Sequence, residues 1–144
     1  MTLQEYHDAW ETDAAIDASE LDAAARNVPL LHARWWKHYT HERLRYKKLD
    51  LEYKSLYLLR YEYWNGRLDD TVRQAHGWPT QPIKVLTPQL SVYLEADAVL
   101  QDLSKKRTLC EETLKFLEDV IKQINGRGFH ISNAIKFLAF KMGV

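Results

Sequence analysis

Cations and aromatic rings alternate between residues 35 and 67, and these are the residue types in the chain that could do chemistry. From residue 43 onward the cations are Arg43, Arg45, Lys47, Lys48, Lys54, Arg60 and Arg67. The rings among them are Tyr46, Tyr53, Tyr57, Tyr61, Tyr63 and Trp64. Because cations neutralise phosphates and an aromatic face can stack on any base, the mixture favours binding of a single-stranded nucleic acid.

The tyrosines of this stretch have a competing interpretation as core residues. Tyr46 and Tyr53 fall on a 3-4 spaced stripe of a helix, where a tyrosine usually buries its ring and leaves its hydroxyl at the edge. Off that stripe lie Tyr57, Tyr61 and Trp64. These three rings are therefore the better candidates for contact with a strand.

Charge is segregated along the chain although the net charge is zero. Residues 1–26 hold seven acidic residues against Arg26 alone, and we expect residues 1–18 to form an acidic N-terminal arm. Residues 34–67 hold nine Lys and Arg against four acids, and residues 121–144 hold four basic residues and no acid. Such blocks predict either contact between an acidic arm and a basic body or a basic surface for a polyanion.

Composition bounds the class of protein. The chain has 144 residues, of which 46% are hydrophobic and 28% charged, which is typical of one folded globular domain. It contains no apolar run long enough to span a membrane and no signal-peptide pattern, so we expect a non-secreted protein without a membrane partner.

Metal and catalytic sites are not expected. His38 and His41 share a helix face, but only Glu42 lies near enough to add a ligand. The single cysteine, Cys110, sits on an apolar stripe and reads as a buried structural thiol. Asp69 and the next residue form a turn more often than a catalytic pair, and no P-loop, dinucleotide turn or hydrolase motif is present. The sequence therefore predicts no enzyme and no cofactor.

A long helix should carry the basic and aromatic residues. We expect it to open near Ser19 and to cover residues 19–65, with a kink or short break at Pro29. Gly66 is a plausible C-cap, and the glycines and prolines that follow predict a linker loop over residues 66–86.

A second long helix should begin at Thr87, which is a suitable N-cap because Pro88 follows at the first helical position. Gly126 and Gly128 should end it, and a short amphipathic helix should complete the segment 87–144. We expect all segments to form one compact domain.

The expected fold class is all-α: a long, coiled-coil-like helical hairpin with short terminal helices. Each long helix has more apolar surface than one partner would cover, which predicts self-association. Glu42, Arg60 and Arg107 interrupt the two apolar stripes and should set their register.

Three segments carry a resemblance to a known family. "IDASEL" near the start, "YWNGR" after the basic stretch and "CEETLKFLEDVIKQINGRGFHI" near the end resemble, in order and spacing, the UvsY-type recombination mediators of T-even-like bacteriophages. The likeness runs from about Ile16 to the end of the chain. Its most specific residues are Tyr63, Trp64, Gly66, Arg67, Cys110, Leu114, Arg127, Gly128, Phe129 and Ile131.

The resemblance implies a ring-like homo-oligomer in the host cytoplasm that binds single-stranded DNA. It implies two further partners, the phage recombinase (UvsX-type), which it helps to load, and the phage single-strand-binding protein, whose hold on DNA it weakens. The arginine of the family's DNA-binding basic pair falls on Arg60, whereas the family's lysine is replaced by Leu58, which leaves a share of phosphate contact to Lys54 or Arg67. The resemblance also implies that the C-terminal helix forms the subunit contacts, through Phe129, Ile131, Ile135, Leu138 and Met142.

Two other functions stay open from the sequence. The first is a structural coiled-coil adaptor without nucleic-acid binding, in which the basic blocks meet the acidic N-terminus of a neighbouring subunit. The second is an RNA-binding regulator, which would discriminate RNA from DNA through 2′-hydroxyl contacts.

Overall fold

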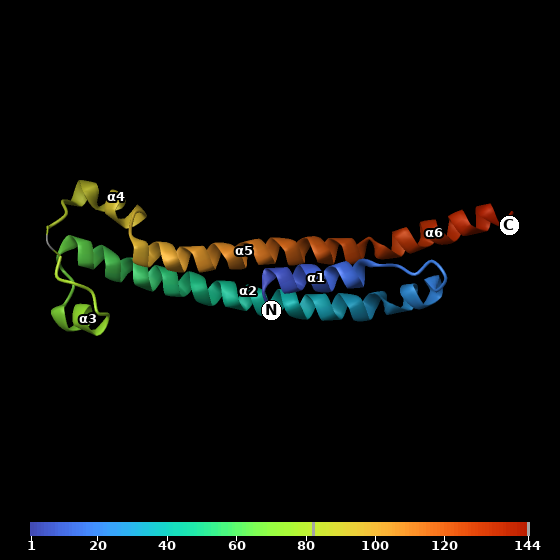
Figure 1. The fold of residues 1–144 in the computed structure, drawn as a ribbon, viewed down its shortest axis with the longest axis horizontal. Coiled ribbons are helices and arrows are strands. Elements are labelled where there is room, and N and C mark those ends of the chain that lie inside the picture. Colours follow the sequence, from blue (N-terminus) through green and yellow to red (C-terminus); the bar gives the residue numbers. More distant parts are fainter. Residues whose placement is uncertain (82, 144) are drawn as a thin grey trace. The chain divides into compact units, whose positions relative to one another are not determined.

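The computed structural model describes residues 1–81 and 83–143. Residue 82, inside the expected linker 66–86, and Val144, at the end of the expected segment 87–144, lie outside the described residues. The helices are α1 (Leu3–Ala14), α2 (Leu21–Asn65), α3 (Asp70–Ala75), α4 (Leu90–Glu95), α5 (Ala98–Asn125) and α6 (Arg127–Lys141), with a short 3-10 helix, η1 (Thr87–Gln89), before α4 (Figure 1). No strand occurs in the described part of the chain, so the all-α prediction is confirmed.

Two compact units share these helices. The first unit comprises Met1–Leu44 and Glu111–Val144, and the second comprises Arg45–Cys110. The finer division into arm, helical segments and linker that we expected from the sequence stays a prediction. None of the helices in the described residues is long and apolar enough to cross a membrane.

The core of the first unit joins α1 to the first part of α2 and the last part of α5. Its buried residues are Tyr6, Leu31, Trp35, Leu117, Val120, Ile121 and Ile124. Figure 1 shows α1 alongside these two helices. Thr2 and Glu5 form a capping box that starts α1. The acidic N-terminal segment is therefore a packed helix, because its apolar face supplies Tyr6 to the core.

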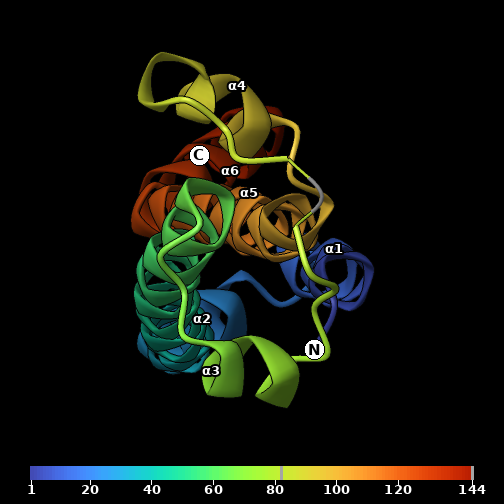
Figure 2. The same cartoon turned by 90° about the vertical axis from the view of Figure 1, so that its left-hand side faces the viewer.

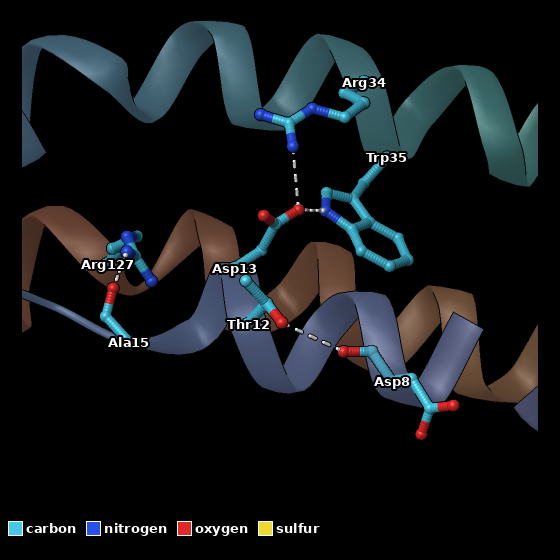
Figure 3. A network of polar contacts seen from close by, with 7 residues as sticks. All are labelled: Asp8, Thr12, Asp13, Ala15, Arg34, Trp35 and Arg127. Atoms are coloured by element: carbon cyan, nitrogen blue, oxygen red, sulfur yellow. Dashed lines mark hydrogen bonds and ion pairs between the residues drawn. The ribbon is translucent and has the colours of Figure 1, made fainter. Parts of the chain in front are cut away.

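Polar contacts fix α1 in place within this unit (Figure 3). Asp13 Oδ2 accepts hydrogen bonds from Arg34 Nη1 at 3.0 Å and from Trp35 Nε1 at 2.9 Å. Arg127 donates from Nη1 to the carbonyl of Ala14 at 3.1 Å and from Nη2 to that of Ala15 at 3.0 Å. Because carbonyls at a helix C-terminus lack partners in the helix, the guanidinium both pairs these acceptors and ties α6 to α1.

His38 makes the stability of the first unit depend on pH. Its ring lies 5.2 Å from that of Tyr6 and 5.3 Å from that of Trp35. Burial, then the positive charges of the N-terminus, Arg34 and His41, lower the pKa of His38 below its usual 6.5, while Asp13 opposes them. The unfolded chain therefore binds a proton at a higher pH than the folded chain does.

We expect the free energy of unfolding to fall as the pH drops from about 6.5 towards the lower folded pKa of His38. Urea denaturation between pH 7.5 and 5.5 measures this change. His38→Gln should flatten that dependence, whereas the exposed His76→Gln should keep it. An equally steep fall in His38→Gln would contradict the assignment.

Helix α2 begins two residues after the expected opening. Asp17 accepts hydrogen bonds from the backbone and hydroxyl of Ser19 and forms a turn before Leu21. Of the kink or short break predicted at Pro29, the break is wrong, since α2 is continuous through it. Proline there removes the hydrogen bond to the carbonyl of Ala25, and both residues face solvent, so water can pair the carbonyl without interrupting the helix.

The turn after α2 begins the second unit's connecting segment. Gly66 adopts a φ of 76°, and the amides of Arg67 and Leu68 donate to the carbonyl of Glu62, which confirms the predicted C-cap. The segment 66–86 is not wholly a loop, because Asp69 accepts from the backbone amide of Thr71 at 2.7 Å and caps α3. Within this unit, α3 and α4 lie on opposite sides of the C-terminal end of α2 (Figure 2).

The second long helix is interrupted, which corrects the prediction of one helix from Thr87. Helix α4 ends at Glu95, and α5 starts at Ala98. The cause is Asp97, whose Oδ1 accepts from the backbone amide of Val99 at 2.9 Å and so caps a new helix. Helix α5 then ends before Gly126, and the predicted short C-terminal helix is confirmed as α6.

Candidate nucleic-acid interface

The cations expected to contact DNA, with one exception, face solvent. Exposed on α2 are Arg43 in the first unit and Arg45, Lys47, Lys48 and Lys54 in the second, and Arg67 is exposed just past its end. Lys54 pairs with Asp50 at 3.0 Å, but its side chain remains largely in solvent. Lys47, Lys54 and Tyr61 are seven residues apart and therefore share one side of α2.

Arg60 is the exception, because its side chain is only 7% exposed. Its Nε donates to Asp97 Oδ2 at 2.6 Å. The guanidinium carbon lies 4.3 Å from the ring centroid of Tyr63, 4.6 Å from that of Trp78 and 5.5 Å from that of Trp64. A cation held by a carboxylate and by aromatic faces is not presented to a phosphate. Direct contact of Arg60 with DNA stays a prediction, and this geometry argues against it.

Asp97 keeps its charge at this buried position. Burial raises the pKa of its carboxyl, but the hydrogen bonds from Arg60 and Trp64, the charge of Arg60 and the amide of Val99 outweigh it, so the net pKa is lowered. The second bond, from Trp64 Nε1, is 2.8 Å long. Arg60, Trp64 and Asp97 therefore form one ionised cluster that joins the end of α2 to the start of α5 within the second unit.

The aromatic candidates divide by exposure. Tyr57 is exposed, Tyr61 is half-buried, and Trp64 is held by Asp97. Tyr63 is buried and donates its hydroxyl to the carbonyl of Pro79 at 2.7 Å, so its ring belongs to the core and not to the candidate interface. Tyr57 therefore presents more of its ring to a strand than Trp64 does.

The other charged members of the apolar stripes are paired, as their position predicts. Glu42 accepts from the hydroxyl of Tyr6 at 3.1 Å in the first unit. In the second unit Arg107 pairs with Asp50 at 3.0 Å and lies over the ring of Tyr53 at 4.0 Å. The hydrogen bond from Lys54 first, and the contact with Arg107 further, lower the pKa of Asp50.

Helix α6 buries Ile131 and leaves most of its other apolar residues in solvent. Of the residues expected to self-associate, Phe129, Ile135 and Met142 are exposed, Leu138 is half-buried, and Ile131 is only 2% exposed. Burial in the same chain argues against Ile131 as a subunit contact, although this assignment too stays a prediction.

The sequence reasoning missed Phe137 and Phe140, which are 63% and 82% exposed. Phe137 follows Phe129 by eight residues, and Phe140 follows Phe137 by three, which places all three on one side of α6, opposite Ile131 and Leu138. That second 3-4 type stripe was the pattern that could have found them.

These features have the character of a helical nucleic-acid-binding protein, and comparison with known proteins gives the family. The model of the family described as "Recombination, repair and ssDNA binding protein UvsY" matches residues 9–144. The chain therefore belongs to the UvsY family, as its sequence motifs indicated. A search of curated proteins finds no match.

Solved structures agree with this assignment at the level of the fold. The chain is similar to three crystal structures of the bacteriophage T4 recombination mediator protein UvsY. The lattice type IV structure superposes on this chain with a TM-score of 0.85 at 21% identity, covering 97% of this chain and 99% of that one. Lattice type II gives 0.85 at 20% identity, covering 99% and 98%. Lattice type I gives 0.81 at 22% identity, covering 96% and 98%. Identities this low carry the fold alone.

Proposed function

We propose that this protein is a recombination mediator that binds single-stranded DNA and promotes loading of the phage recombinase onto DNA covered by single-strand-binding protein. The observation that carries the proposal is the family match over residues 9–144. The exposed cations of α2 support it independently, because they offer phosphate contacts that need no base identity. A mediator requires such binding, since it acts on DNA of any sequence.

The phosphate contacts in this proposal come from the exposed cations and not from the buried Arg60. Lys47 and Lys54 share one side of α2 with Tyr61, so a strand along this side meets charge and ring together. In the described residues no ion pair holds Lys47, Lys48 or Arg67, so these side chains are available to phosphates without breaking one. Tyr57 supplies a further exposed ring.

The proposed assembly is a ring-like homo-oligomer whose subunits meet through the exposed side of α6. Phe129, Phe137 and Phe140 give that side a contiguous apolar character that a second copy would cover. Repeating a modest DNA site around a ring raises affinity, because every contact after the first is intramolecular. This arrangement would let weak sites compete with a bound single-strand-binding protein.

The test of DNA binding is fluorescence anisotropy of a labelled single strand titrated with the protein over a salt series, with duplex of equal length as control. We expect tighter binding to the single strand and a linear fall of log affinity with log salt. The double variant Lys47→Gln/Lys54→Gln should lower that slope by about 1.4, since each lost phosphate contact contributes about 0.7.

The matched control is Lys105→Gln/Lys106→Gln, which removes two exposed cations from α5 and should leave the slope unchanged. Equal slopes in all three proteins would remove α2 from the interface. Absence of binding at low salt would leave the adaptor function, which predicts salt-sensitive assembly alone. Recombinase loading is then measured as filament formation on DNA pre-covered with single-strand-binding protein.

A further inference from the structure

A groove in the first unit contains one residue that the sequence nominated for DNA contact, Arg43, and five that it did not. Helix α2 lines it with Trp36, Tyr39 and Arg43, and α5 lines it with Glu118, Ile121 and Lys122. Its volume is about 300 Å³, and it is open to solvent. It therefore combines aromatic faces, an aliphatic floor and two cations in one concave surface.

Trp36 is the feature that marks this groove. It is 49% exposed, whereas the other four tryptophans of the chain are buried or half-buried. A tryptophan buries more apolar area than almost any other side chain, so one left in solvent beside a groove indicates a ligand surface more than a packing residue.

Neighbouring rings hold Trp36 in a defined orientation. The ring of His32 stacks on it at 6.0 Å between centroids with an interplanar angle of 10°. The ring of Tyr39 lies 5.4 Å away at 37°. Tyr39 is itself anchored, because its hydroxyl donates to Glu118 Oε1 at 3.3 Å. A ring fixed on two sides loses little conformational freedom when a flat ligand stacks on it.

The charges of the groove favour an anionic ligand. Arg43 and Lys122 are exposed at its rim, one from each helix. The single carboxylate of the lining, Glu118, already accepts the hydrogen bond from Tyr39. Arg43 follows Trp36 by seven residues on the same side of α2, about 10 Å along the helix axis. A stacking face with cations beyond it suits a nucleotide, which joins a flat base to a phosphate.

We propose that this groove binds a nucleotide of single-stranded DNA, with the base stacked on Trp36 and the adjoining phosphates contacted by Arg43 and Lys122. The inference rests on the proposed function and adds to it a stacking subsite that contains no residue of the second unit. Stacking accepts every base, so the subsite contributes affinity without sequence preference.

The test compares full-length variants by anisotropy with labelled oligo(dT) at fixed moderate salt. Trp36→Ala should weaken binding about tenfold, and Trp36→Phe should restore most of the loss, because phenylalanine keeps a stacking face. The salt slope of Trp36→Ala should match that of the unmodified protein. Lys122→Gln should instead lower the slope by about 0.7, because it removes a phosphate contact. Leu30→Ala, an exposed apolar change on the same helix away from the groove, is the control and should bind normally.

The outcomes separate this inference from the proposed function. If the unmodified protein binds oligo(dT) and both Trp36→Ala and Lys122→Gln bind equally well, the groove is not a DNA subsite and the proposed function stands. If the unmodified protein does not bind at any salt concentration, the proposed function is wrong, and the subsite inference, which rests on it, is wrong as well. A smaller sedimentation coefficient in Trp36→Ala, with weaker binding only through lost assembly, would make Trp36 a subunit contact and overturn the inference. Should Trp36→Ala fail to fold, Lys122→Gln alone decides.

Discussion

Asp97→Ala is expected to lower the free energy of unfolding by about 3–5 kcal/mol, the usual effect of removing one partner from a buried ion pair. The substitution leaves the guanidinium of Arg60 buried among Tyr63, Trp64 and Trp78 without its carboxylate. It also removes the cap of α5 and the acceptor for Trp64. Because Asp97 makes all these contacts, its substitution should lower the free energy of unfolding more than any substitution of an exposed residue.

Urea denaturation followed by far-ultraviolet circular dichroism measures the change. Asp102→Ala is the matched control, since it removes an exposed carboxylate from α5, the helix that Asp97 caps, and should cost under about 0.5 kcal/mol. A loss of less than about 1 kcal/mol in Asp97→Ala would contradict the description of this pair as structural.

The same pair tests the role of Arg60 in DNA binding. The double variant Arg60→Met/Asp97→Met removes both charges and should be more stable than either single variant, because no charge is left buried alone. If Arg60 positions the end of α2, this variant should bind single-stranded DNA with an unchanged salt slope. A slope lower by about 0.7 in the folded double variant would instead restore Arg60 as a phosphate contact.

Replacing Phe129, Phe137 and Phe140 by serine is expected to break the assembly and to weaken single-strand binding by about 10²–10⁴-fold. All three side chains are exposed in the single chain, so the triple variant should keep its helix content. Its subunits would then bind DNA one at a time and lose the gain in effective concentration that a ring provides.

Sedimentation velocity measures the assembly, and anisotropy on the same samples measures the binding. The triple variant tests the subunit contact more specifically than truncation after Gly126 would. The truncation would also remove the hydrogen bonds from Arg127 to α1 and the buried Ile131. Lys136→Ser, a polar change on the same helix, is the control. An unchanged sedimentation coefficient in the triple variant would exclude this side of α6 as the subunit contact.

Local signals in the sequence were sufficient for the all-α class, for α2 and α6 and for the family, but not for α3 or for the interruption between α4 and α5. The 3-4 periodicity of α2 and α6, the glycine C-cap at Gly66 and the motif "YWNGR" each depend on residues close together in the chain. Helix periodicity, caps and family motifs are properties of a short window, so no knowledge of distant contacts was needed. All-α structure and membership of the UvsY family follow from them.

Only the tertiary structure decided which side chains are available to partners. In the sequence Arg60 belongs both to an apolar stripe and to a basic stretch, and only its pairing with Asp97, 37 residues later, decides that it is buried. Ile131 and Phe140 are equally apolar in the sequence, yet one is buried and the other exposed because a single side of α6 faces its own chain. Periodicity shows that a helix has two sides, but the side that is buried depends on helices far away in sequence. For Arg60, burial means that its guanidinium pairs with the carboxylate of Asp97 and is not available to a phosphate.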